Sequence, residues 1–184
     1  RSGTNSTMKD HLHGIAEESV SILNKSDGSV LDIGCNDGTL VGFYPEGYRK
    51  AGIDPSDIAQ EIDKRNVTVI QDTFPSEELL NCLQTTKIDI VTSIAMFYDL
   101  EDPILFARGI KNILAEEGIW IFEMSYMPMM LKMNSYDTIC HEHLEFYSLA
   151  VIEYILKKSG LKIFNVKLNE INGGSIRCYA THIT

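Results

Sequence analysis

The segment from Val30 to Leu40 constrains the fold of this chain more than any other feature of its sequence. An apolar run contains the carboxylate of Asp32, the chain then turns at Gly34 and Gly38, and a helical pattern follows. Glycines let a backbone approach a ligand closely, and the first turn of a helix offers free N–H groups to an anion. The segment therefore predicts a strand, a glycine loop and a helix, with a ligand bound over the loop.

The rest of the chain alternates between strand and helix patterns. Short runs of β-forming residues predict strands at about 29–33, 49–53, 67–70, 87–93, 119–123, 162–167 and 175–182. Apolar residues with a helical period predict helices at about 8–23, 57–64, 76–83, 102–114 and 149–158. Repeated strand–helix–strand units favour a parallel sheet with helices on both faces. The turn Asn172-Gly173-Gly174 predicts a hairpin that adds one antiparallel strand at or near the sheet edge.

Finer details of the helices are also readable. Thr7 is the expected N-cap of the first helix, and Glu117-Gly118 is expected to end the helix that precedes the fifth strand. The inner face of that helix is predicted from its apolar residues, which are Ile104, Leu105, Ile110, Ile113 and Leu114. We therefore predict an α/β protein with a Rossmann-like, mostly parallel seven-stranded sheet.

Length and charge limit the classes of protein. At 184 residues the chain is the size of one domain, residues 1–184, and its abrupt ends suggest a piece of a longer protein. The net charge of -10 and the lack of a basic stripe argue against a nucleic-acid partner. No apolar run approaches the roughly 20 residues that a membrane span needs, and no signal peptide is recognisable. We expect a cytoplasmic protein with reduced thiols at Cys35, Cys82, Cys140 and Cys178.

The glycine loop discriminates between two cofactors. A dinucleotide site requires glycine two residues after Gly34, where this chain has Asn36. The pattern instead resembles the first motif of S-adenosylmethionine enzymes, in which the amino-acid end of the cofactor lies over the loop. Acidic or small residues follow the next three strands, where open α/β sheets bind ligands. The predicted cofactor residues are Asp32, Gly34, Cys35, Asn36, Gly38, Asp54, Pro55, Asp72, Thr73, Phe74, Ser93 and Ala95.

Each of these residue types suits a part of that cofactor. A carboxylate accepts several hydrogen bonds, so Asp54 is expected to bind both ribose hydroxyls. Asp72 is expected to accept from the adenine amino group while Phe74 covers the ring. The stretch from Ser93 to Ala95 is expected to pass the methionine moiety.

A second polar segment follows the fifth strand, and it contains His141-Glu142-His143. The alternatives for this segment are an acid–base site, an ordinary loop and a metal site. A metal is disfavoured because H-E-x-x-H spacing and a third ligand are missing. Histidine is the side chain best matched to proton transfer near neutral pH. We therefore predict catalytic roles for His141, Glu142 and His143, and no metal.

The His141-Glu142-His143 box, the Gly173-Gly174-Ser175-Ile176-Arg177 turn and the glycine loop together resemble the sugar C-methyltransferase family. The resemblance implies a class I methyltransferase sheet and methyl transfer to carbon 3 of a nucleotide-linked 4-keto-deoxysugar. It also implies that His143 removes the C3 proton to give an enolate, while Glu142 orients His143 or contacts the sugar.

The resemblance leaves some substrate contacts open. Some family members have a tyrosine at the position of Cys140, so Tyr98, Tyr136 or Tyr147 is expected to substitute for it. Arg177 is predicted to pair with a substrate phosphate, or else to face solvent from a strand. The methionines between Met124 and Met133 are expected to fill the core or to form a wall over the substrate.

Two other functions remain open at this point. The cofactor is compatible with an O- or N-methyltransferase that acts on another small metabolite. A non-catalytic module with a methyltransferase fold is the third alternative.

Overall fold

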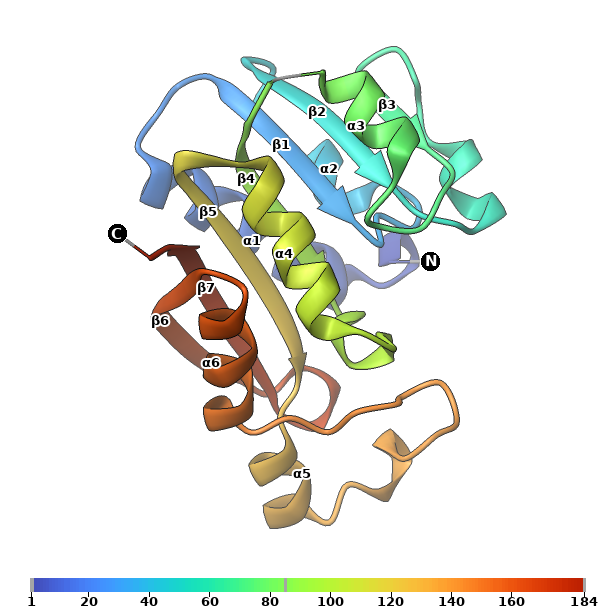
Figure 1. Cartoon of the computed structure of the whole chain (residues 1–184). Coiled ribbons are helices and arrows are strands. Elements are labelled where there is room, and N and C mark those ends of the chain that lie inside the picture. Colours follow the sequence, from blue (N-terminus) through green and yellow to red (C-terminus); the bar gives the residue numbers. More distant parts are fainter. Residues whose placement is uncertain (1, 85, 184) are drawn as a thin grey trace. The chain divides into compact units, whose positions relative to one another are not determined.

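The computed structural model describes residues 2–84 and 86–183, and its described strands form one hydrogen-bonded series in the order β3-β2-β1-β4-β5-β7-β6 (Figure 1). The strands are β1 Gly28–Ile33, β2 Tyr48–Ile53, β3 Val67–Ile70, β4 Ile88–Ile94, β5 Leu114–Ser125, β6 Leu161–Asn169 and β7 Ser175–His182. β1 and β3 both pair with β2 in parallel, whereas β7 runs antiparallel to both β5 and β6. The predicted Rossmann-like sheet with one antiparallel strand is therefore confirmed.

The helices follow the predicted alternation with strands. They are α1 Ser6–Leu23, α2 Thr39–Gly42, α3 Glu77–Leu83, α4 Pro103–Ile113, α5 Met127–Met133 and α6 Leu149–Lys158. Short 3-10 turns lie at Ser2–Thr4, Asp57–Glu61, Phe97–Asp99, Tyr136–Thr138 and Ile171–Gly173. None of the described helices is long and apolar enough to cross a membrane.

The chain divides into two compact units, which we describe separately. Unit 1 comprises residues 1–92 and 113–119, and unit 2 comprises residues 93–112 and 120–184. In unit 1, α3 covers one face of β1–β3, and α1 and α2 lie on the other (Figure 1). Ile33 pairs with Ile53 and Ile53 with Ile70, so the segments that follow β1, β2 and β3 meet at one edge.

Unit 2 is built around an aromatic cluster. The rings of Trp120 and Phe122 stack with centroids 4.2 Å apart, and Phe97 lies 5.4 Å from Phe122 and 5.9 Å from Phe106. All four side chains are fully buried or nearly so. The indole N–H of Trp120 donates to the hydroxyl of Ser93 at 2.9 Å, so the polar edge of the ring is satisfied.

Two predictions about helix ends were wrong. The N-cap of α1 is Asn5, not Thr7, because the Asn5 side chain accepts from the backbone N–H of Thr7 at 2.9 Å. The helix predicted for 57–64 is a 3-10 turn that ends at Glu61. Ile62 is extended there, and its side chain is buried against Gly38.

The prediction for α4 also needs correction. Leu105 was predicted to face inward but is 53% exposed, whereas Phe106 and Ala107 are buried. β5 begins at Leu114 directly after the helix, so the expected break at Gly118 lies inside the strand. A Cβ at Gly118 would lie 3.0 Å from the carbonyl oxygen of Ile88, so this glycine permits close backbone approach.

The methionines of the 124–133 stretch differ in burial, so core filling is confirmed for some of them and the wall over the substrate stays a prediction. Met124 and Met130 are buried and fill the core of unit 2, whereas Met133 is 56% exposed. Met129 packs on the hairpin, because a Cβ at Gly174 would lie only 2.9 Å from the Met129 Cβ.

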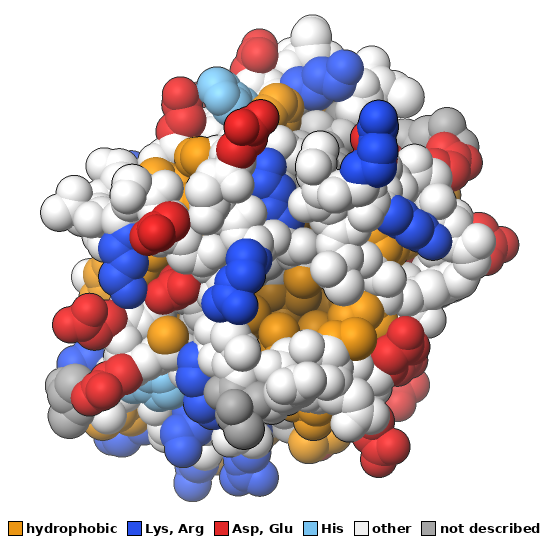
Figure 2. All heavy atoms as spheres, turned by 90° about the horizontal axis from the view of Figure 1, so that it is seen from above, with side chains coloured by type: hydrophobic (Ala, Val, Ile, Leu, Met, Phe, Trp, Pro, Cys, Tyr) orange, Lys and Arg blue, Asp and Glu red, His pale blue; other side chains and the backbone are white. Residues whose placement is uncertain are grey.

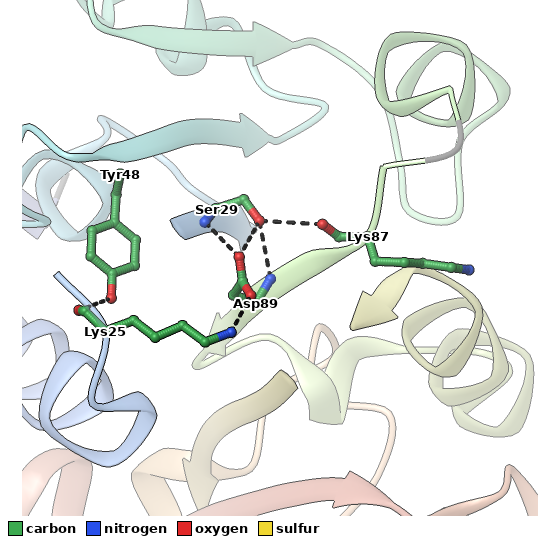
Figure 3. Close-up of polar contacts among 5 residues, drawn as sticks. All are labelled: Lys25, Ser29, Tyr48, Lys87 and Asp89. Carbon is green, nitrogen blue, oxygen red and sulfur yellow. Dashed lines mark hydrogen bonds and ion pairs between the residues drawn. The ribbon is translucent and has the colours of Figure 1, made fainter. Parts of the chain in front are cut away.

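A polar cluster ties together the amino ends of β1 and β4 in unit 1 (Figure 3). Asp89 accepts from the backbone N–H and the hydroxyl of Ser29, both at 2.9 Å, and from Lys25 Nζ at 3.2 Å. The Tyr48 hydroxyl donates to the Lys25 carbonyl at 2.9 Å. Burial alone would raise the pKa of Asp89, but the bonds from Ser29 and Lys25 outweigh it and hold this pKa below its usual value.

We expect Asp89→Asn to lower the free energy of unfolding by about 1–2 kcal/mol at pH 7, because a charge-assisted contact is lost. Since the folded pKa lies below the unfolded one, this stabilisation is present above the unfolded pKa and disappears as the pH falls through the folded pKa. Urea unfolding at pH 7 and at pH 3 measures the loss of stability at each pH, with the Asp27→Asn variant of an exposed neighbour as control. A loss that is equal at the two pH values would contradict the prediction.

Candidate functional site

The glycine loop of unit 1 is pinned to the end of β2. The N–H groups of Gly34 and Cys35 both donate to the carbonyl of Ile53, at 2.8 and 3.3 Å. Gly34, Asn36 and Gly38 have φ values of 74°, 49° and 75°, a left-handed conformation that favours glycine and asparagine. The loop then enters α2, which has only four residues and is shorter than the sequence suggested.

Two glycines make room for this loop. A Cβ at Gly38 would lie 3.0 Å from a side-chain carbon of Ile62. A Cβ at Gly52 would lie 2.7 Å from the sulfur of Cys35, which is itself buried. Burial raises the pKa of the Cys35 thiol, so this residue acts as a small apolar group. Sequence reasoning missed Gly52, although a glycine inside a strand is a known signal of close approach.

Asp54 organises the segment after β2 and also holds the loop. Its Oδ2 accepts from the backbone N–H of Asn36 at 2.9 Å, and its Oδ1 accepts from the N–H and hydroxyl of Ser56 at 2.8 and 2.5 Å. The side chain is largely buried, with 9% exposure. A carboxylate has about four acceptor positions, so Asp54 retains capacity for a further donor.

Asp32 lies within β1, buried to 3% exposure. Its Oδ1 accepts from the Thr92 hydroxyl at 2.6 Å. Burial raises the pKa of Asp32 to about 7, the Asp54 carboxylate adds to the shift, and the Thr92 hydroxyl opposes it. This carboxyl group therefore braces β1 against β4 beneath the loop.

One polar atom of the loop has no partner among the described residues. The Oδ1 atom of Asn36 is buried without a hydrogen bond. A buried acceptor without a donor costs free energy, so a ligand that donates here would be favoured. The ammonium group of a bound amino acid is such a donor. The loop therefore fits the amino-acid end of S-adenosylmethionine.

The predicted adenine contacts lie after β3 in the same unit. Asp72 accepts from the Ser76 hydroxyl at 2.6 Å and from the Thr73 N–H at 2.7 Å, and these bonds lower its pKa. Ser76 in turn caps α3 through the N–H of Leu79. Phe74 is half-buried and Pro55 is exposed. The contacts of these residues with adenine remain a prediction.

The predicted cofactor residues Ser93 and Ala95 belong to unit 2. Ser93 is buried and bonded to Trp120. Ala95 is exposed, has a φ of 55°, and donates its N–H to the carbonyl of Glu123 at 2.8 Å. An alanine in a left-handed conformation is strained, and such strain is concentrated at functional sites.

Unit 2 contains a cavity of about 300 Å³ near His143. Its lining residues are Tyr98, Ser125, Asp137, Thr138, His143 and Asn172. The Thr138 hydroxyl already donates to the Ser135 carbonyl at 2.7 Å. Three further uncharged groups of the lining can donate hydrogen bonds, namely the phenol of Tyr98, the hydroxyl of Ser125 and the amide of Asn172. Burial raises the pKa of Tyr98 to about 12, so the phenol stays protonated at neutral pH.

His143 is held in one tautomer within this cavity. Its Nδ1 lies 2.7 Å from the carbonyl oxygen of Thr138. A carbonyl oxygen only accepts, so Nδ1 carries the proton and the neutral ring keeps its lone pair on Nε2. The ring packs on Tyr98 at a centroid distance of 4.2 Å, and the Tyr98 carbonyl accepts from the N–H groups of Leu144 and Glu145. The arrangement leaves Nε2 able to accept a proton.

Asp99 is a nearby carboxylate that sequence reasoning missed. Burial raises its pKa, the His143 ring opposes this shift, and Glu142 adds to it. An ionised Asp99 would stabilise the imidazolium that forms when His143 takes up a proton.

The other two residues of the predicted catalytic box lie in solvent. The side chains of His141 and Glu142 are 92% and 74% exposed, and His141 Nε2 lies 3.9 Å from a Glu142 carboxylate oxygen. The Thr138 carbonyl orients His143, so the orienting role expected of Glu142 was wrong, and the alternative, a contact of Glu142 with the sugar, stays a prediction. A backbone carbonyl is invisible to motif reasoning, because any residue supplies it.

The three tyrosines differ in their surroundings. Tyr136 is 75% exposed, whereas Tyr98 and Tyr147 are 7% and 3% exposed. The Tyr147 hydroxyl is buried and has no hydrogen-bond partner among the described residues. Tyr98 lines the cavity near His143. The substrate roles of Tyr98, Tyr136 and Tyr147 stay predictions.

Arg177 does not face solvent, so that alternative was wrong. Its side chain is buried, and its Nε donates to Glu123 Oε2 at 2.7 Å. The same oxygen accepts from the Asn169 amide at 2.9 Å. The pair joins β5 to β7. On β5, Glu123 lies two residues before Ser125, which lines the cavity.

Comparisons with known proteins identify the family and the fold of this chain. A family described as a methyltransferase domain matches residues 5–166. The C-methyltransferase NovU of Streptomyces niveus is 28% identical over 176 residues, covering 92% of this chain and 41% of NovU. The chain thus spans about two fifths of the length of this relative.

Solved structures show the same fold at low identity. Magnesium protoporphyrin IX methyltransferase from Synechocystis PCC 6803, solved with bound SAH, has a TM-score of 0.73 at 16% identity, covering 98% of this chain and 89% of its own. An S-adenosylmethionine-dependent methyltransferase from Clostridium acetobutylicum ATCC 824 has a TM-score of 0.72 at 14% identity, covering 96% and 92%. Because the family match extends over most of the chain, this protein belongs to the methyltransferase domain family, and its fold is that of the S-adenosylmethionine-dependent methyltransferases.

Proposed function

We propose that this domain transfers the methyl group of S-adenosylmethionine to carbon 3 of a nucleotide-linked 4-keto-deoxysugar through an enolate. The observation that carries the proposal is the bond between His143 Nδ1 and the Thr138 carbonyl, which leaves Nε2 as a base. Methyl transfer to an amine nitrogen has less need of such a base, because the nitrogen already carries a free lone pair, whereas carbon 3 becomes nucleophilic only when its proton is removed. The 28% identity to a C-methyltransferase supports the same choice.

The cofactor would be held by the loop at 34–38 and by Asp54. Asn36 Oδ1 would accept from its ammonium group and Asp54 from its ribose hydroxyls. Asp72 and Phe74 would bind its adenine, and Ser93 and Ala95 would pass its methionine part. When bound, the cofactor supplies an electrophilic methyl group on a sulfonium that is a good leaving group.

The residues of unit 2 would carry out the proton transfer. A 4-keto group acidifies the proton on carbon 3, and His143 Nε2 would remove it. The resulting enolate oxygen would be stabilised by donors of the cavity lining, such as the Tyr98 phenol and the Asn172 amide. Three exposed side chains of the same segment would contact the sugar or its nucleotide outside the cavity, namely those of Tyr136, His141 and Glu142. Arg177 would act on a phosphate only if it also kept its bond to Glu123.

Two measurements test the proposal in sequence. Calorimetric titration with S-adenosylhomocysteine, with NAD as control, tests the cofactor site, and binding of the first alone is expected. Incubation with a nucleoside-diphosphate-4-keto-6-deoxyglucose in D₂O then tests the chemistry, and exchange of the C3 proton is expected. Cofactor binding without exchange of this or related 4-keto sugars would favour an O- or N-methyltransferase. Failure to bind cofactor would favour a non-catalytic module.

We expect Tyr147→Phe to separate function from stability. Removing a buried hydroxyl that lacks a partner should leave the free energy of unfolding unchanged or raise it by about 1 kcal/mol. We infer that the unpartnered Tyr147 phenol donates to a bound ligand, so the same change should slow methyl transfer. Urea unfolding and turnover measure the two effects. Tyr154→Phe, at an exposed tyrosine on α6, is the control. A clear loss of stability in Tyr147→Phe would show that the hydroxyl serves the fold.

A further inference from the structure

Unit 1 has a second cavity that plays no part in the proposed methyl transfer. It has a volume of about 160 Å³ and lies between the strands β1–β3 and helix α3. Figure 2 shows an apolar hollow on this end of the molecule, with Lys and Arg side chains around it. The lining includes Ser29, Arg49 and Thr68, which lie near the amino ends of their strands. The cofactor loop follows the opposite, carboxyl end of β1.

The local sequence explains why this space is open. Ala51 offers only a methyl group between the strands and α3, and α3 has only seven residues. Ile70 and Leu79 form a buried apolar part of the lining, and Leu83 is half-buried. A cavity of about 150 Å³ lined by such side chains binds benzene in another protein, so a single six-membered ring is of suitable size here.

The rim of this cavity is positively charged in an acidic protein. Arg49 lines the cavity and is exposed, and its guanidinium makes no ion pair or hydrogen bond with the described residues. The whole chain has a net charge of -10, so an unpaired guanidinium beside an apolar hollow is a local exception. The Ser29 hydroxyl is engaged with Asp89 and Lys87 (Figure 3). The lining contains two cationic residues, Arg49 and Lys50, and neighbouring side chains of a strand point to opposite faces of the sheet. Arg49 therefore shares the face of Ala51, and its guanidinium is the group suited to an anion.

We propose that this cavity binds a small carboxylate that carries one six-membered ring or a branched chain of similar size. The apolar part fills the space beside Ala51 and Leu79, and the carboxylate pairs with Arg49. A pocket with an apolar lining and one charged group is the usual form of a small-molecule site. The proposal does not depend on the acceptor of the methyl group.

Cys82 provides a natural reporter for the test, because it is exposed and lines the cavity. We expect benzoate to slow alkylation of Cys82 by iodoacetamide and to leave the rate at Cys140 unchanged. Benzyl alcohol, which has the ring but no charge, should bind about tenfold more weakly. Equal protection by the two compounds would overturn the role of Arg49, and no protection by benzoate would overturn the site.

Variants test the same site by chemical-shift titration in NMR. Arg49→Gln should remove the preference for benzoate over benzyl alcohol, whereas the matched control Arg108→Gln should keep it. Ala51→Leu should fill the cavity and abolish binding of both compounds, and Leu83→Phe fills it from the helix if Ala51→Leu does not fold. Binding of S-adenosylhomocysteine should be unchanged in every folded variant. Retained benzoate binding in a filled variant would contradict the proposal.

Discussion

Replacing His143 by alanine will abolish exchange of the C3 proton of the keto sugar and lower turnover by about 10²–10⁴-fold, the usual contribution of a general base. The reason is geometric, because the Thr138 carbonyl holds the proton on Nδ1 and leaves Nε2 to accept another. Affinity for S-adenosylhomocysteine should stay nearly the same, since His143 is not among the residues proposed to hold the cofactor.

The measurement is hydrogen–deuterium exchange at carbon 3, followed by mass spectrometry, beside calorimetry with S-adenosylhomocysteine. His13→Ala removes a partly exposed histidine of α1 and serves as the matched control. His143→Gln keeps a polar side chain but cannot act as a base near neutral pH, so it should behave like the alanine variant. If exchange persists in both His143 variants, another group is the base and the proposed role of His143 fails.

The second large effect is expected at the buried ion pair of Glu123 and Arg177. Their side chains are 4% and 10% exposed, and the Nε–Oε2 distance is 2.7 Å. Removing one member of such a pair leaves a buried charge without its partner, which costs about 3–5 kcal/mol. Arg177→Met and Glu123→Gln should each lower the free energy of unfolding by about this amount. The double variant Glu123→Gln/Arg177→Met should recover part of the loss, because both charges are then absent.

Urea unfolding of the three variants measures these energies as a double-mutant cycle. Arg108→Met, at an exposed arginine of α4, is the control for the loss of positive charge. Binding of the sugar nucleotide to Arg177→Met, measured beside its stability, tests the phosphate role that the sequence predicts for Arg177. If Arg177→Met is as stable as the unchanged protein but binds the sugar nucleotide poorly, the guanidinium serves the substrate rather than the fold.

Much of the glycine-loop site was readable from the sequence because its signals are local. Gly34 and Gly38 adopt the left-handed conformation that their positions suggested, and Asp54 lies at the end of its predicted strand. Such features depend on backbone freedom and on the order of strands. The partner atoms were not readable, because the bond from the Asn36 N–H to Asp54 joins residues 18 positions apart.

The acid–base site was readable only in part. The sequence motif identified His143, but it also predicted catalytic roles for the neighbouring His141 and Glu142. In the structure His141 and Glu142 are exposed, and His143 is oriented by a carbonyl and packed on Tyr98. Asp99, Ser125 and Asn172 come from three other segments of the chain, and no local pattern connects them.

The predicted inner face of α4 was partly wrong because it also depends on residues far apart in the chain. Leu105 fits a helical apolar stripe, yet Phe106 and Ala107 are the buried residues, because the aromatic cluster around Phe97 and Trp120 selects the face that packs. The period of apolar residues in a helix does not determine which side of the helix faces the core to better than about one residue, and tertiary packing decides this.

The sequence by itself determined the order of strands and helices, the hairpin at Asn172-Gly173-Gly174, the glycine loop and the class of cofactor. These follow from periodicity, turn chemistry and the spacing of a few residues, which act over short stretches of chain. Only the tertiary structure decided that Arg177 is buried against Glu123, that Thr138 sets the tautomer of His143, and that Ala51 leaves a cavity beside α3. Burial, charge pairing and cavity volume depend on residues far apart in the chain, so they exist only once the chain has folded.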